Sequence, residues 1–227
     1  MTDRAEQLHW DREELRRRGH EAIDWVVDYL AGIEQRSVLS RVEPGEVAAS
    51  LPEHPPARGE SFDEVLADLD RVVMPGITHW QHPSWFAFFN SNTSGPSMVA
   101  DIISSGLAVQ GMLWQTSPAC TEVETRMMDW LVEMLALPES FLSTGAGGGV
   151  IQDTASSATL CALVAAREQA SDFAVDRDGV QKSMTVYASS EAHSSVEKAV
   201  RIAGLGSDQF RHVDLDEDLC IDPAALD

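Results

Sequence analysis

Apolar residues recur at helical spacing near the start of the chain and predict a helix over residues 11–33. The stripe consists of Ile23, Val26, Leu30 and Ile33. Asp11 and Glu14 form a cap pair at its start. Because a stretch rich in Pro and Gly follows over residues 37–60, the helix has little of its own chain nearby. The stripe is therefore expected to pack either against a partner subunit or against the rest of its own domain.

Three further helices are predicted in the middle of the chain. The sequence Ser61-Phe-Asp-Glu64 is a capping box that opens a helix, which Pro75-Gly76 ends. An irregular segment with five aromatic residues follows: Trp80, Trp85, Phe86, Phe88 and Phe89. Such residues are either buried filling or a pocket wall. The two later helices run from Pro96 to about Leu107 and from Pro118 to about Ala136.

The pattern changes in the last third to alternating helices and strands. A helix over 156–170 precedes a short apolar strand over 184–188. Ser194 to Glu197 then caps a second helix, which ends at Gly204, and a second strand follows over 210–213. This order predicts an open α/β sheet with crossover helices. Ligands bind at the carboxyl ends of strands in such sheets, which places residues 188–193 near the glycine-rich turn before the helix. Asp222-Pro223 begins one more helix, so we expect the sheet to be unfinished at residue 227.

That glycine-rich turn is the strongest chemical signal in the chain. Residues 145–149 read Gly-Ala-Gly-Gly-Gly, and Thr154, Ser156 and Ser157 follow where the helix begins. The first turn of a helix has unpaired N–H groups that bind phosphate. The patterns of nucleotide-binding loops are absent, which argues against a nucleotide. A tight turn that only caps the helix is the equally open alternative.

Composition excludes several classes of function. The net charge of −21 in 227 residues repels nucleic acid and anionic membranes. We find no membrane-spanning run and no signal peptide, and three widely spaced cysteines fit a reducing compartment, so we expect a cytoplasmic protein. His79 and His82 lack a third ligand, so no metal site is expected. Lys182 and Lys198 are the only lysines among 16 basic residues.

Several blocks in one order carry a family resemblance. They are residues 75–80, 82–89, 114–122, 128–131, 147–152 and 192–197. Together they resemble the N-terminal half of the group II pyridoxal-phosphate amino acid decarboxylases, in particular the aromatic-L-amino-acid decarboxylase branch. The resemblance implies an α/β, fold type I PLP-dependent transferase-like protein. Residues 1–75 would form a helical arm and linker, and residues 76–227 the first part of the PLP-binding large domain.

The resemblance also implies roles for individual residues. Thr154, Ala155 and Ser156 would bind the phosphate of pyridoxal 5'-phosphate, and His193 would stack on its ring as the catalytic residue. The substrate pocket would be lined by Trp80, Phe88, Phe89 and Ser91, with Gln110 and Met112 reaching the neighbouring subunit's site. Three departures stand out: Asn90 replaces a proline, Gln110 an apolar residue, and Asp153-Thr154 a Gly-Ser pair.

In this family the Schiff-base lysine and the aspartate that pairs with the pyridine nitrogen lie in the second half of the protein. Neither Lys182 nor Lys198 matches that lysine's motif. We therefore expect this chain to need a second polypeptide or C-terminal half for decarboxylation of an aromatic L-amino acid, in a homodimer or a heterotetramer-like assembly. The alternatives are a non-catalytic truncated relative that acts as a binding or regulatory subunit, and an aromatic aldehyde synthase.

Overall fold

The computed structural model describes residues 10–89, 93–180 and 184–226. They form two compact units, which divide between Ala108 and Val109. The domain boundary expected from the sequence lies elsewhere, between residues 75 and 76, and it stays a prediction. None of the helices in these ranges combines the length and the apolar character needed to cross a bilayer.

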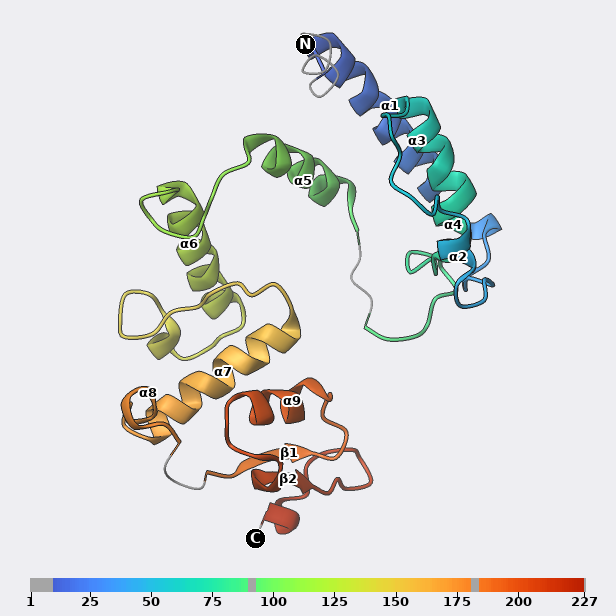
Figure 1. The fold of residues 1–227 in the computed structure, drawn as a ribbon. Coiled ribbons are helices and arrows are strands. Elements are labelled where there is room, and N and C mark those ends of the chain that lie inside the picture. The colour runs from blue at the N-terminus through green and yellow to red at the C-terminus, as the bar shows by residue number, and fades with distance from the viewer. Residues whose placement is uncertain (1–9, 90–92, 181–183, 227) are drawn as a thin grey trace. The chain divides into compact units, whose positions relative to one another are not determined.

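Unit 1 is helical (Figure 1). Its helices are α1 (Arg12–Ala31), α2 (Glu46–Ala49), α3 (Phe62–Asp68), α4 (Met74–Gly76) and α5 (Gly95–Leu107). A π-helical turn, Leu69–Val73, joins α3 to α4. Both predicted caps are confirmed, because the Asp11 carboxylate accepts the Glu14 N–H at 2.7 Å and Ser61 and Glu64 form a capping box.

Helix α1 packs against α3 of its own unit, side by side in Figure 1. The Arg18 guanidinium donates to the Asp63 carboxylate at 2.6 Å, and the Trp10 and Phe62 rings meet edge to face at 5.3 Å. The expectation that α1 has little of its own chain to pack against is therefore wrong. A second face of α1 remains exposed, with Leu15, Ile23 and Val27 at intervals of four or eight residues.

Unit 2 contains the α/β part of the chain. Its elements are α6 (Pro118–Met134), α7 (Ala155–Ala170), α8 (Val175–Asp178), β1 (Val186–Ser189), α9 (Ser195–Ile202) and β2 (Phe210–Val213). Strands β1 and β2 pair in parallel, with Val186 opposite Phe210 and Ser189 opposite Val213. Parallel neighbours need a crossover, which α9 supplies. The predicted order of helix, strand, helix, strand is confirmed.

The core of unit 2 lies where α9 packs against α7 and the strands. Val200, Ala203 and Leu205 are buried there. Leu163 and Val164 of α7 contact them from one side, and Val186 and Phe210 of the strands also pack against this cluster. This packing fixes the starts of α7 and α9 relative to one another, which matters because both predicted cofactor-binding segments lie at these starts.

Candidate active site

The first turn of α7 presents a group of unused hydrogen-bond donors. Thr154 is the N-cap, and its hydroxyl accepts the Ser157 N–H at 3.2 Å. Within the described residues, the N–H groups of Ala155 and Ser156 have no acceptor, and both residues are exposed. The Thr154 hydroxyl also lies 2.9 Å from the Ser157 hydroxyl, and it keeps its proton for a ligand when Ser157 is the donor of that hydrogen bond. This arrangement fits a phosphate group, which accepts from free N–H groups and favours the positive end of the helix dipole.

The glycines before α7 have a packing role. A side chain on Gly147 would place its Cβ 1.9 Å from the backbone oxygen of Ser140, and one on Gly149 would lie 3.1 Å from Met128 of α6. Gly148 adopts a φ of +154°, a conformation that favours glycine. The Ile151 N–H after the turn donates to the Glu124 carboxylate at 2.8 Å. The turn is therefore held against α6, and the free donors come from α7.

His193 lies between β1 and α9 with an exposed ring. Its Nδ1 accepts the backbone N–H of Ser195 at 3.2 Å and lies 2.9 Å from the Ser195 hydroxyl. A backbone N–H can only donate, so Nδ1 is the acceptor and the ring proton is on Nε2. The predicted cap is wrong in one respect: Ser194 makes no side-chain capping bond, and His193 satisfies the first turn of α9 instead.

A cavity joins the two helix starts. It has a volume of about 220 Å³ and is lined by Ser156, Ser157 and Leu160 of α7 and by Ser195, Lys198, Ala199 and Ile202 of α9. Ser195, which fixes the His193 ring, thus shares a cavity with Ser156. Of the residues predicted for the cofactor, Ser156 lines this cavity, and His193 is linked to it through its hydrogen bond with Ser195. Ser195 was not predicted from the sequence, although it stands two residues after His193.

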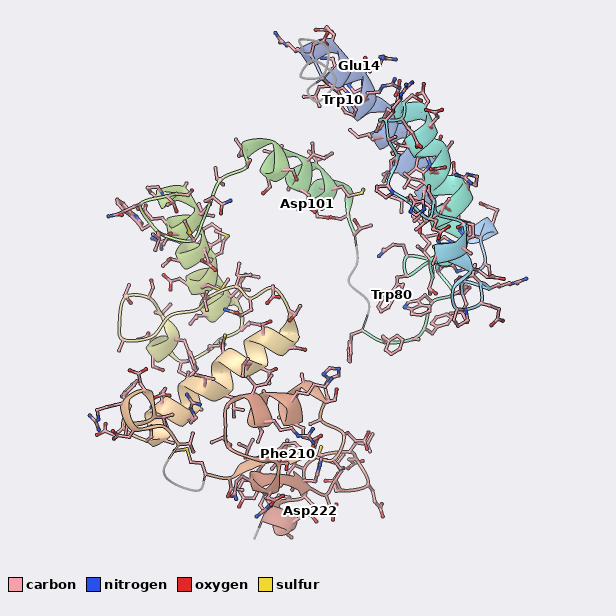
Figure 2. All side chains as sticks on the ribbon, in the orientation of Figure 1. Trp10, Glu14, Trp80, Asp101, Phe210 and Asp222 are labelled. Carbon is pink, nitrogen blue, oxygen red and sulfur yellow. The ribbon has the colours of Figure 1, made fainter. Side chains whose placement is uncertain are left out.

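The residues predicted to contact the substrate are divided between the units. Trp80, Trp85 and Phe88 form an aromatic cluster in unit 1, with ring centroids 5.1 Å apart for Trp80 and Trp85 and 5.8 Å for Trp80 and Phe88. Figure 2 shows Trp80 among the rings of this segment. Phe88 has a left-handed φ of +59°, which is uncommon for a bulky residue and is typical of functional segments. Phe89 is fully exposed.

Two other predicted residues lie near the start of unit 2, and a third is not described. Gln110 and Met112 begin unit 2, where the Thr116 hydroxyl donates to the Gln110 carbonyl at 2.7 Å and Met112 is 74% exposed. Ser91 lies outside the described residues, as do Asn90 and Lys182. The substrate roles of all these residues remain predictions.

Comparison with known proteins identifies the family. A family model described as the pyridoxal-dependent decarboxylase conserved domain matches residues 44–227. The chain belongs to this family. Its cofactor is pyridoxal 5'-phosphate (PLP), and the free donors at the start of α7 fit the phosphate of this cofactor.

Individual relatives agree with the family model. The chain is 47% identical over 200 residues to the aromatic-L-amino-acid decarboxylase of Bos taurus and 43% identical over 201 residues to the phenylacetaldehyde synthase of Arabidopsis thaliana, covering 85% and 88% of this chain. It spans 41% of each relative's length. The crystal structure of Oryza sativa tryptophan decarboxylase with PLP and tryptamine superimposes with a TM-score of 0.88 at 39% identity, over 95% of this chain and 45% of that one. The predicted α/β, fold type I architecture is confirmed.

Proposed function

We propose that this chain forms the phosphate-binding and ring-stacking part of a PLP-dependent enzyme that converts an aromatic L-amino acid to the corresponding amine and CO2. The observation that carries the proposal is the pairing of free donors at the start of α7 with an oriented, exposed imidazole at the start of α9. Family membership supplies the cofactor, and relatives named as aromatic amino acid decarboxylases support the reaction.

The residues of unit 2 have separate tasks in this proposal. The N–H groups of Ala155 and Ser156 and the hydroxyls of Thr154 and Ser156 hold the phosphate. His193 rests against the ring and excludes water from that side, and Ser195 keeps the imidazole from rotating. Bound PLP supplies an electron sink for the bond to the substrate carboxylate. An oriented stacking residue assists because that bond breaks only when it is perpendicular to the ring.

Substrate selection would use the aromatic segment of unit 1. Trp80, Phe88 and Phe89 offer large apolar surfaces that match an aromatic side chain, and Ser91 follows them in the sequence. Gln110 and Met112 would reach the site of a neighbouring subunit, in a homodimer or heterotetramer-like assembly. Phe89 and Met112 are both exposed, so their side chains are available for such contacts.

The Schiff-base lysine is proposed to come from residues outside this chain. Lys198 is an exposed residue of α9 in the wall of the 220 Å³ cavity, and neither it nor Lys182 matches the lysine motif of the family. Borohydride reduction of the PLP-loaded, active protein followed by peptide mass mapping tests this. We expect the reduced adduct on a lysine outside residues 1–227; an adduct on Lys182 or Lys198 would reject this part of the proposal.

The reaction itself is tested by its products. The assembled, PLP-loaded protein is incubated separately with tryptophan, tyrosine, dopa and phenylalanine, each labelled in the carboxyl carbon. From at least one of these amino acids we expect labelled CO2 and an equal amount of the unlabelled amine. If none of the four amino acids releases CO2, the proposed decarboxylation is rejected in favour of the alternative, in which the chain is a non-catalytic binding or regulatory subunit.

An aromatic aldehyde synthase is the second candidate function. The phenylacetaldehyde synthase among the relatives supports it, at an identity close to that of the decarboxylases. Such an enzyme consumes O2 and water and yields the aldehyde, CO2, ammonia and hydrogen peroxide. A peroxide assay on the same reactions separates the two functions, because the decarboxylase forms an amine and no peroxide.

A further inference from the structure

A tyrosine of the arm helix is hydrogen-bonded to a buried histidine beside the aromatic segment. The Tyr29 hydroxyl lies 3.0 Å from Nδ1 of His79, across 50 positions of sequence. The Tyr29 ring also stacks on Trp25 at 5.9 Å, and the Arg36 guanidinium lies over it at 5.4 Å. Tyr29 is thus held on several sides, so its hydroxyl has a defined position.

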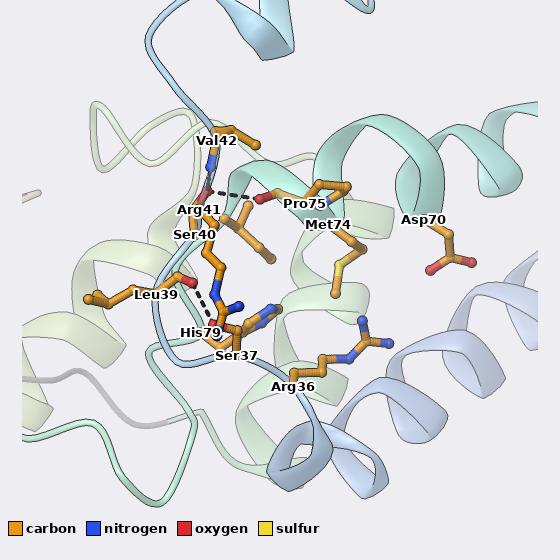
Figure 3. A pocket seen from close by; sticks show the side chains of 11 residues that line it. Arg36, Ser37, Leu39, Ser40, Arg41, Val42, Asp70, Met74, Pro75 and His79 are labelled. Carbon is orange, nitrogen blue, oxygen red and sulfur yellow. Dashed lines mark hydrogen bonds between the residues drawn. The ribbon is translucent and has the colours of Figure 1, made fainter.

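His79 is held through both its side chain and its backbone. Only 5% of its surface is exposed, and its N–H donates to the Val38 carbonyl at 2.9 Å. The same segment is tied again by the Ser40 hydroxyl, which donates to the Pro75 carbonyl at 2.8 Å. His79 lies beside Arg36 and Arg41 in the wall of a cavity of about 440 Å³ (Figure 3).

The protonation of the pair follows from its surroundings. Burial lowers the pKa of His79, and the nearby Arg36 and His82 charges lower it further. Burial raises the pKa of Tyr29, against the opposing effect of Arg36. A neutral imidazole and a protonated phenol form one good hydrogen bond, with Tyr29 donating to Nδ1 and the imidazole proton on Nε2.

The residue after His79 is Trp80, whose ring packs on Trp85 and Phe88. We infer that Tyr29 and His79 are a positioning pair for the aromatic substrate: their hydrogen bond holds the backbone at the start of the aromatic segment, and so sets where the Trp80 ring lies. The inference rests on the proposed function, in which Trp80 contacts the substrate. Neither residue of the pair is placed at the cofactor.

Two substitutions, one at each residue, remove the hydrogen bond between Tyr29 and His79. Tyr29→Phe keeps the contacts with Trp25 and Arg36 and deletes only the hydroxyl. His79→Leu deletes the acceptor, whereas His79→Asn restores an acceptor oxygen near the position of Nδ1. Tyr187→Phe, in the chain's only other tyrosine, is the matched control. The kinetic constants of the assembled holoenzyme are measured with its preferred aromatic amino acid, and PLP affinity is measured separately.

For Tyr29→Phe and His79→Leu we expect KM to rise about tenfold, the factor that corresponds to one buried hydrogen bond, with PLP affinity unchanged and kcat changed less than KM. His79→Asn and Tyr187→Phe should keep the original KM. An unchanged KM in Tyr29→Phe, or an equal KM rise in His79→Asn and His79→Leu, would overturn the inference.

Trp80→Leu separates this inference from the function on which it rests. If Trp80→Leu raises KM and Tyr29→Phe does not, the positioning pair is rejected and the substrate role of Trp80 stands. If Trp80→Leu leaves KM unchanged, the substrate role fails, and the positioning pair fails with it.

Discussion

Asp153 places a carboxylate next to the free donors of α7. It is exposed and precedes the N-cap Thr154. A negative charge there repels a phosphate group, although solvent and salt screen the repulsion. We therefore expect Asp153 to weaken binding of the cofactor phosphate at this site.

Replacing that carboxylate should strengthen cofactor binding. We expect Asp153→Asn to tighten PLP binding by about two- to fivefold at low salt, the size of an exposed charge interaction, and by less at high salt. Titration of the apoprotein with PLP at two ionic strengths measures this. Asp176→Asn, an exposed change in α8, is the control and should have no effect. Unchanged affinity in Asp153→Asn would mean that its carboxylate points away from the phosphate.

His79 links the stability of unit 1 to pH. Its pKa is lowered by burial, so the unfolded chain binds more protons than the folded chain below the ordinary value of 6.5. The free energy of unfolding should therefore fall as the pH decreases through 6.5 and level off below the folded pKa. The lowered pKa values of Glu14, Glu64 and Asp129 act later, below their ordinary values of 4.5, 4.5 and 3.8.

Denaturant unfolding between pH 7 and pH 5 tests the linkage. His79→Asn should remove this part of the pH dependence, because asparagine does not titrate. His54→Asn, at an exposed position, should retain it. Identical pH profiles for the original chain and His79→Asn would contradict the linkage.

At the scale of elements, His193 at the start of α9 has two roles: it caps the helix, and in the proposed function its ring stacks on the cofactor. His193→Asn should keep the cap, since its side-chain oxygen accepts the Ser195 N–H, and His193→Ala should lose it at a cost of about 1 kcal/mol. Both variants lack the imidazole, so turnover should fall strongly and by similar factors. Thermal unfolding and steady-state kinetics on the same samples decide it. Full turnover in His193→Asn would show that the histidine is only a cap.

Local signals predicted most of the elements. Capping residues marked the starts of α1 and α3, and alternating helices and strands gave the order of unit 2, because these features depend on neighbours in sequence. The free donors of α7 could also be predicted, since every helix start leaves N–H groups unpaired. The role of His193 at the cofactor ring was inferred from family resemblance and stays a prediction, and its capping bond to Ser195 was not foreseen.

Long-range contacts account for what the sequence did not reveal. The stripe predicted for α1 did not include Arg18, which is buried among the carboxylates of Glu14, Glu21 and Asp63. An arginine in a helical pattern normally indicates a solvated face, and the Asp63 partner, 45 positions away, has no local signal. The same holds for Tyr29 and His79, whose pairing has no local signal.

At the scale of the whole molecule, large apolar side chains remain uncovered in both units. Ile23 and Val27 of α1 are 44% and 54% exposed, and Met134 of α6 is 78% exposed. A chain with a net charge of −21 resists nonspecific association, so specific partners are the better explanation for such surfaces. This agrees with the proposed assembly of subunits.

Charges on the exposed face of α1 should weaken that assembly. We expect Ile23→Asp combined with Val27→Asp to lower the mass measured by light scattering, because an unpaired carboxylate is costly to bury at an interface. Asp24→Ser, which lies on the same helix, should leave the mass unchanged. If the original chain is a folded monomer at the same concentration, this face is not an interface.

The proposed binding of the cofactor phosphate depends most on the free N–H groups at the start of α7. Ala155→Pro removes one of them without breaking the helix, because proline is favoured at the first helical position and Thr154 has the extended backbone that precedes proline well (φ −146°, ψ 161°). Calorimetric titration of the assembled apoprotein compares PLP with pyridoxal, which lacks the phosphate. We predict that Ala155→Pro weakens PLP binding by about tenfold or more and leaves pyridoxal binding unchanged. Unchanged PLP affinity, with the helix intact by circular dichroism, would contradict the placement of the cofactor phosphate.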